Sequence, residues 1–133
     1  MDLSKIPVGV NPPYDVNAII EIPQGGEPVK YELDKESGAI IRCRPIGCLM
    51  MVDEAGGDEK ILAVPVDKLH PFYAGVDSWR SLPAILTEQI AHFFQHYKDL
   101  EKGKSVEIVR WADPEETGEI IRQSIERHNA KHG

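Results

Sequence analysis

The chain has 133 residues, of which 41% are hydrophobic and 28% are charged, so it suits one folded domain over residues 1–133 and excludes wholesale disorder. Its 22 acidic and 15 basic residues give a net charge of −7, which argues against a nucleic-acid partner because phosphate backbones require a basic surface. The first residues lack a basic region followed by a long apolar core, and no run reaches the length of a membrane span. We therefore expect a cytoplasmic protein with no membrane partner.

The start of the chain predicts a surface arm. Pro7, Pro12 and Pro13 are incompatible with a regular helix or a central strand over residues 1–16. A strand pattern follows at residues 18–22.

A second strand is predicted at residues 28–34, after a glycine-containing turn at 24–27. Apolar and charged residues alternate along it, so Lys30 and Glu32 lie on the face opposite the core. An amphipathic strand with a solvated outer face is enough to explain this row of charges. A functional role for the row is the alternative.

Residues 43–65 predict a β-hairpin with charge at its tip. Two apolar runs, 46–52 and 61–64, flank a polar loop that holds four carboxylates and one lysine. These residues are Asp53, Glu54, Asp58, Glu59 and Lys60. Crowded carboxylates repel one another, so the loop is either a solvated turn or the site of a cation. Lys60 favours the cation, because it lies within reach of any anion that a bound cation would attract.

The two cysteines lie in this hairpin. Cys43 and Cys48 are five residues apart, which places them on opposite faces of a regular strand. This spacing argues against a shared metal or a disulfide between them. We expect two reduced, buried thiols.

A helix is predicted from Ser81 to Gly103. Ser81 suits the N-cap, Pro83 suits the first turn, and Gly103 suits the end. Apolar residues recur every three or four positions and form one stripe. They are Leu82, Leu86, Ile90, Phe93, Tyr97 and Leu100.

Four residues in the second half of this helix could have either a functional or a purely structural role. His92 and His96 are four apart, a spacing that suits zinc, but no third ligand is apparent and the glutamate of H-E-x-x-H is missing. Tyr97 lies on the apolar stripe and Lys98 lies near the negative end of the helix. Core packing and interaction with the helix dipole are therefore enough to explain these last two.

The chain ends with a predicted strand at 105–111 and a helix that Asp113 caps, with Pro114 at its first position. The apolar stripe of this helix is short, comprising Ile120, Ile121 and Ile125. We expect it to pack as a half-buried lid on the surface of the sheet.

Three blocks of the sequence resemble the soluble inorganic pyrophosphatases. They are IEIP with PVKYELDKESGA, then MVDEAGGDEK, then QIAHFFQHYKDLEKGK, and they occur in the family's order. The resemblance extends over residues 19–104. On these motifs the chain is identified as a member of that family.

The resemblance implies hydrolysis of inorganic pyrophosphate to two phosphates by water that Mg²⁺ activates. Residues at matching positions imply that Glu21 and Glu32 are catalytic and orient metal-bound water. Asp53 and Asp58 would be the metal ligands. The substrate phosphates would contact Lys30, Lys60, Tyr97 and Lys98.

The family's fold is a small, curved antiparallel β-barrel, OB-like, with helices packed outside, so the expected class is α+β. In the family, the turn that matches SGA at 37–39 leads into several strands that carry an arginine, two tyrosines and a D-x-D-P-x-D signature. Here the chain passes directly into IIRCRPIG, and the signature is absent. We therefore expect an internal deletion near 39–41 and an incomplete barrel with two packed helices. Ser105 also replaces a residue that is usually aromatic.

Two functions of different class remain open. The first is a Mg²⁺-dependent inorganic diphosphatase. The second is a catalytically weak or inactive truncated homologue that acts as a binding or oligomer partner, which the missing carboxylates favour. In either case we expect a homo-oligomer, because the family forms them and an open barrel exposes unpaired strand edges.

Overall fold

An antiparallel sheet forms the centre of the protein, which a computed structural model describes over residues 5–19 and 40–132. Its strands are β1 (Val16–Ile19), β2 (Ile40–Asp53), β3 (Gly56–Pro65) and β4 (Val106–Ala112). The long strand β2 is central: β3 pairs along one edge, while β1 and β4 pair with the beginning and the end of the other edge. Every pairing is antiparallel.

The sheet is open in the part of the chain that the structure describes. There, β3 and β4 each pair only with β2, so their outer edges meet no further strand. Two helices pack on this sheet, which confirms the α+β class and agrees with an incomplete barrel. The predicted strand at 28–34 and turn at 24–27 lie outside the described residues.

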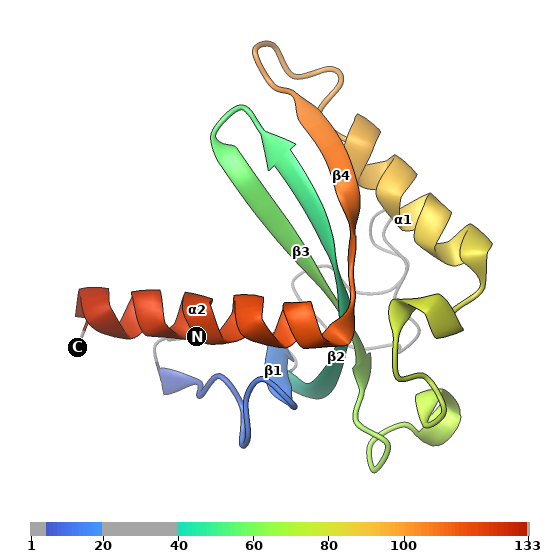
Figure 1. Ribbon diagram of the computed structural model, residues 1–133, viewed down its shortest axis with the longest axis vertical. Helices are drawn as coiled ribbons and strands as arrows, with labels where there is room; N and C mark the ends of the chain where they lie inside the picture. The colour runs from blue at the N-terminus through green and yellow to red at the C-terminus, as the bar shows by residue number, and fades with distance from the viewer. Residues whose placement is uncertain (1–4, 20–39, 133) are drawn as a thin grey trace.

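The helices lie on the two faces of the sheet (Figure 1). Helix α1 (Ala84–His96) runs beside β4, and α2 (Pro114–His132) crosses the part of the sheet near β1. Because side chains alternate along a strand, Leu49 and Met51 point to the face of α1, whereas Cys48 points to the face of α2. The most completely buried residues are Ile46, Cys48, Leu49, Met51, Ala112 and Thr117. The core therefore lies along β2.

The hairpin is confirmed, but the predicted polar loop is shorter than expected. Only Glu54 and Ala55 form the turn, and β3 begins at Gly56. Asp53 stabilises this turn, since its Oδ1 accepts a hydrogen bond from the N–H of Ala55 at 2.8 Å. Gly56 has a φ of 123°, which a residue with a side chain rarely adopts. The tight turn lets Asp58 and the residues after it join the strand.

The helix predicted at 81–103 is shorter than expected at both ends. Leu82 is extended, because a residue before proline is disfavoured in the helical region, and Pro83 takes the cap position that Ser81 was expected to hold. The helix ends at His96, and turns lead on to Gly103. Leu100 is consequently fully exposed and does not extend the apolar stripe.

The C-terminal helix begins where it was predicted and covers the sheet as a half-buried lid. Thr117 and Ile121 are its buried residues, and Ile120 and Ile125 are partly buried. Asp113 precedes it, but its Oδ1 accepts hydrogen bonds from Trp79 Nε1 at 3.2 Å and Arg80 Nε at 3.0 Å. The side chain of this aspartate thus ties the segment before α1 to the start of α2.

An ion pair of Asp15 helps to attach the N-terminal arm to the sheet. Asp15 is buried, accepts from the N–H of Val10 and Asn11, and pairs with Arg42 at 3.0 Å. The first strand begins at Val16, two residues before the predicted start at 18, and is described as far as Ile19. Residues 20–22 of the predicted strand lie outside the described residues.

Both cysteines are free and buried, as expected. Burial raises the pKa of each thiol to about 11. No helix within 5–19 and 40–132 is long and apolar enough to cross a membrane.

Candidate active site

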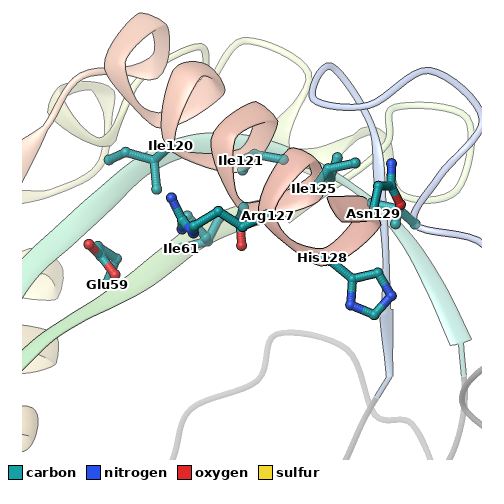
Figure 2. A pocket seen from close by; sticks show the side chains of 10 residues that line it. Glu59, Ile61, Ile120, Ile121, Ile125, Arg127, His128 and Asn129 are labelled. Carbon is teal, nitrogen blue, oxygen red and sulfur yellow. The ribbon is translucent and has the colours of Figure 1, made fainter. Parts of the chain in front are cut away.

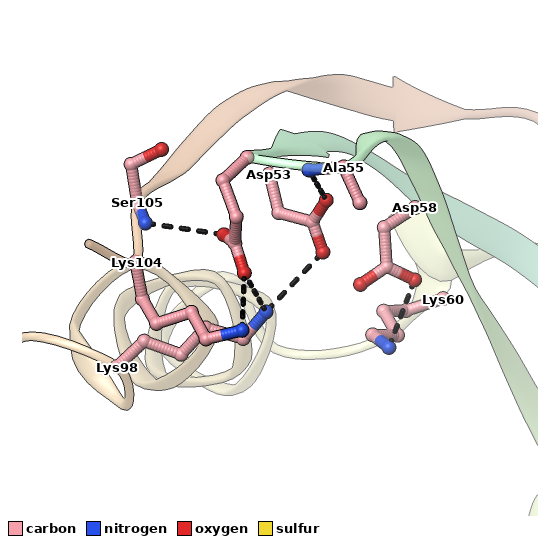
Figure 3. A network of polar contacts seen from close by, with 8 residues as sticks. Asp53, Ala55, Asp58, Lys60, Lys98, Lys104 and Ser105 are labelled. Carbon is pink, nitrogen blue, oxygen red and sulfur yellow. Dashed lines mark hydrogen bonds and ion pairs between the residues drawn. The ribbon is translucent and has the colours of Figure 1, made fainter. Parts of the chain in front are cut away.

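The tip of the β2–β3 hairpin and the segment that follows α1 form a cluster of acids and lysines (Figure 3). Asp53 closes β2, while Asp58 and Lys60 lie on β3 opposite Met51 and Leu49. These side chains share the sheet face that packs against α1, because the residues paired across a hairpin point to the same side. The fold thereby brings Lys98 and Lys104 to the hairpin tip.

Asp53 and Lys98 form the most enclosed ion pair of this cluster. Lys98 Nζ donates to Asp53 Oδ2 at 3.2 Å, and the two side chains are 16% and 14% exposed. The N–H of Ala55 and the ammonium of Lys98 lower the pKa of Asp53. Desolvation opposes the charge of Lys98, but the hydrogen bond to Asp53 and the charge of Glu54 outweigh it and raise the pKa of Lys98. Both groups are therefore charged at neutral pH.

Glu54 belongs to the cluster, although the sequence predicted it only as one of the loop carboxylates and not among the site residues. Its Oε1 pairs with Lys104 at 3.1 Å and with Lys98 at 3.6 Å, and its Oε2 accepts from the N–H of Ser105 at 3.2 Å. Hydrogen bonds from its own N–H, from Ser105 and from Lys104 lower the pKa of Glu54 to about 2. The adjacent acids at 53 and 54 were the signal available in the sequence, but the distant lysines that meet them were not predictable from spacing.

Asp58 and Lys60 form a second ion pair on the same face. Lys60 Nζ lies 2.9 Å from Asp58 Oδ1, and it lies 5.6 Å from the centre of the Phe94 ring of α1. Phe94 was also absent from the predicted site. Its ring provides an apolar wall and a weak cation–π contact for the lysine.

Tyr97 lies at the edge of the cluster and is half-exposed, so the core interpretation of this residue is wrong. Its ring stacks on Phe93 at 5.6 Å, and Lys98 Nζ lies 5.5 Å from its centre. The residue caps the C-terminus of α1, where the chain turns toward the hairpin tip.

Five of the eight predicted site residues are thus described, and they meet at one place. They are Asp53, Asp58, Lys60, Tyr97 and Lys98. The other three, Glu21, Lys30 and Glu32, lie outside the described residues.

The described acids have the right chemistry for Mg²⁺ but are few. Carboxylate oxygens are the ligands that Mg²⁺ prefers, and Asp53 and Asp58 share one face. However, residues 5–19 and 40–132 hold no group of three or more His, Cys, Asp or Glu that could bind a metal ion. His92 and His96 lack a third ligand there as well, and His96 Nδ1 instead lies 2.8 Å from Asp99.

A separate groove of about 400 Å³ lies on the opposite face of the sheet, between α2 and β3 (Figure 2). Glu59 and Ile61 line it, and they alternate along β3 with the two site residues Asp58 and Lys60. Isoleucines of α2 form much of the other wall. The groove is therefore distinct from the ion-pair cluster.

A family model and individual related proteins both match this chain, and both indicate the same family. The sequence model of the family described as inorganic pyrophosphatase matches residues 36–129. A Caulobacter vibrioides inorganic pyrophosphatase is 63% identical over 174 residues, covering 97% of this chain and 98% of that protein. One from Bradyrhizobium diazoefficiens is 43% identical over 178 residues and covers both chains completely. Both alignments are longer than the 133 residues of this chain.

Solved structures of similar proteins indicate the same family as the sequence comparisons. An inorganic phosphatase from Anaplasma phagocytophilum superimposes with a TM-score of 0.80 at 33% identity, over 88% of this chain and 95% of that one. An inorganic pyrophosphatase from Coxiella burnetii gives 0.81 at 28% identity, over 92% and 99%. The structure of the Thermus thermophilus pyrophosphatase shares the fold, with a TM-score of 0.85 over 97% and 99%. The chain belongs to the inorganic pyrophosphatase family.

Proposed function

We propose that this chain hydrolyses inorganic pyrophosphate to two phosphates, with Mg²⁺ as its cofactor. One observation carries the proposal: Lys60 and Lys98 lie beside Asp53 and Asp58 on one face of the sheet, in a chain of the inorganic pyrophosphatase family. Lysines provide positive charge for phosphate oxygens, and carboxylates provide oxygen ligands for Mg²⁺.

In this proposal Asp53 and Asp58 hold the metal, and Glu21 and Glu32 orient the attacking water. When bound, Mg²⁺ neutralises phosphate charge and lowers the pKa of a coordinated water. The lysines and the tyrosine of the predicted site hold the phosphates in line for attack and stabilise the charge that leaves with the product. They are Lys30, Lys60, Tyr97 and Lys98.

We further propose that the single domain of residues 1–133 carries an internal deletion near 39–41. The absence of D-x-D-P-x-D and the length of the alignments with the bacterial relatives support it. Because the family's signature supplies central metal carboxylates, we expect turnover far below the typical enzyme value of about 10 s⁻¹.

The proposed function is tested by measuring the phosphate that the purified chain releases from pyrophosphate. The mass of the intact protein is measured first, to verify that it is the 133-residue chain. We expect slow turnover that requires MgCl₂, and Mg²⁺ binding of roughly millimolar affinity by calorimetry. Asp58→Asn is expected to abolish both. Glu59→Gln is the matched control, since it removes one carboxylate from the next residue on the opposite face. Equal loss in both variants would contradict the assignment of Asp58, and turnover at or above about 10 s⁻¹ would show that the missing segment is dispensable.

Absence of turnover with retained Mg²⁺ or phosphate binding would favour the alternative function, an inactive homologue that acts as a binding or oligomer partner. Resequencing of the locus tests whether the deletion belongs to the gene. A cytoplasmic location and a homo-oligomeric state are further parts of the proposal.

A further inference from the structure

Helix α2 carries a row of charged and polar residues on its exposed surface. The row repeats every four residues, so its members form one continuous ridge along the helix. This α2 ridge consists of Glu115, Glu119, Gln123, Arg127 and Lys131, and all five residues are exposed. Acids occupy its first half and bases its second half, on either side of a neutral centre at Gln123.

The helix dipole explains only the two ends of this order. Acids near the start of a helix and bases near its end interact favourably with the dipole, and the effect falls off within one turn. Glu115 and Lys131 lie in the first and last turns of α2. Glu119 and Arg127 lie farther inside the helix, so the dipole does not account for them.

Contacts within the described ranges, 5–19 and 40–132, leave most of this charge without an opposite partner. Glu119 pairs with Arg122 at 3.4 Å and accepts a hydrogen bond from Gln123 at 3.3 Å. The other three charged residues of the α2 ridge form no ion pair in those ranges. Their charges are therefore available to another chain.

An apolar surface adjoins the α2 ridge. Arg127 also lines the groove between α2 and β3, together with Ile61 and Ile120 (Figure 2). Ile61 is 40% exposed, and Ile120 is only partly buried. A helix laid on the ridge can cover part of this apolar surface, which adds a hydrophobic contribution to the contact.

The order of charges in the α2 ridge is self-complementary for two antiparallel helices. A two-fold axis at Gln123 brings together residues equally far from that centre. Glu119 then meets Arg127 of the second copy, and Glu115 meets Lys131 of the second copy, each twice. Ridges with this spacing interlock in the commonest class of helix packing, at a crossing angle of about 50°. Parallel helices would instead bring like charges together.

We propose that two copies of this chain associate through α2, with their α2 ridges antiparallel about Gln123. The contact is isologous, since both copies contribute the same surface. This inference rests on the homo-oligomeric part of the proposed function, and it adds to it the surface and the symmetry.

Charge reversal in the whole chain, followed by analytical ultracentrifugation, tests the inference. Arg127→Glu with Lys131→Glu makes an all-acidic ridge, and Glu115→Lys with Glu119→Lys makes an all-basic ridge. Each reversed chain is expected to self-associate roughly tenfold or more weakly than the wild-type chain, because attraction becomes repulsion at every pair. An equimolar mixture is expected to form a dimer of one copy of each. Both reversed chains keep a net negative charge, so overall charge does not explain that dimer.

Glu101→Lys with Glu107→Lys is the matched control. It changes the net charge as much as the all-basic ridge does, at two exposed positions outside α2, and is expected to associate like the wild-type chain. Glu119→Arg alone is expected to weaken association, and addition of Arg127→Glu is expected to restore it. These last two variants carry the test if a double reversal fails to fold, which circular dichroism detects.

Three results overturn the inference. They are reversed chains that associate as strongly as the wild-type chain, a mixture that associates no better than its components, and a wild-type chain that stays monomeric throughout the concentration series. The two proposals fail separately. Association that follows the charges of the α2 ridge, without pyrophosphate turnover, rejects only the hydrolase. Turnover by a chain whose association ignores those charges rejects only the interface.

Discussion

At the scale of single residues, Glu54 is held by more groups than any other acid of the cluster. Two backbone N–H groups and Lys104 lower its pKa from 4.5 to about 2. A carboxyl group whose pKa falls on folding stabilises the folded state above its unfolded pKa, and this contribution is lost as the pH drops toward the folded pKa. For Glu54 the relevant window lies between 4.5 and about 2.

We therefore expect Glu54→Gln to lower the melting temperature at neutral pH. The difference from the wild-type chain should shrink through this window and vanish near its lower end, because the wild-type carboxyl is then protonated as well. Thermal melts at a series of pH values, followed by circular dichroism, measure it. Glu107→Gln, an exposed acid on β4, is the control and should follow the wild-type curve. A constant difference at all pH values would contradict a role for the charge of Glu54.

At the scale of elements, the segment between α1 and β4 depends on one glycine. Gly103 has a φ of 77°, and a Cβ built there would meet nothing within 4 Å. The requirement for glycine is therefore conformational and not steric. This segment also carries Lys98 and Lys104 to the hairpin tip, so its backbone path affects the site.

Gly103→Ala is expected to destabilise the protein by about 1–2 kcal/mol, the cost of a left-handed conformation for a residue with a side chain. Gly75→Ala is the matched control, because Gly75 also has open space around it and no positive φ. That change is expected to be neutral or to stabilise by about 0.4–1 kcal/mol through the unfolded state. Urea denaturation measures both free energies of unfolding. Equal stability of the two variants would contradict the conformational account.

At the scale of the whole molecule, the open sheet is expected to lower the stability of the monomer. The outer edges of β3 and β4 meet no further strand within the described ranges. Unpaired edges leave backbone hydrogen-bonding groups to water or to another chain.

We expect either a melting temperature below roughly 65 °C, the upper end for mesophile domains, or strong association of the protein. Calorimetry at several protein concentrations measures both properties. A cooperative melt of a monomer above that temperature would contradict an open barrel as the functional form.

Association itself has a direct measurement. We expect light scattering to show a homo-oligomer at tens of micromolar protein, because contact between copies can cover exposed edges and apolar side chains. A single monomeric species under those conditions would reject the homo-oligomer. The prediction concerns assembly alone and is independent of turnover.

The sequence by itself determined the family, the order of the described strands and helices, and five of the residues that meet at the site. These features depend on local pattern: alternation along β2 and β3, the Asp-Pro start of α2, and motifs at fixed spacing. The extent of the helix before Tyr97 was harder to predict, because its apolar stripe continued past the turn at which the helix ends. Periodicity alone does not reveal such a turn.

Only the tertiary structure decided which charges meet. Lys98 and Asp53 are 45 positions apart, and no spacing rule connects them. Their contact exists because α1 packs along β4 while β4 pairs with the end of β2, so that the end of the helix reaches the hairpin tip. Electrostatic interactions depend on distance and on exclusion of water, and packing sets both quantities. The family resemblance predicted a phosphate contact at Lys98 and a metal ligand at Asp53. It did not predict that these two side chains form an ion pair, because that depends on their distance in the folded protein.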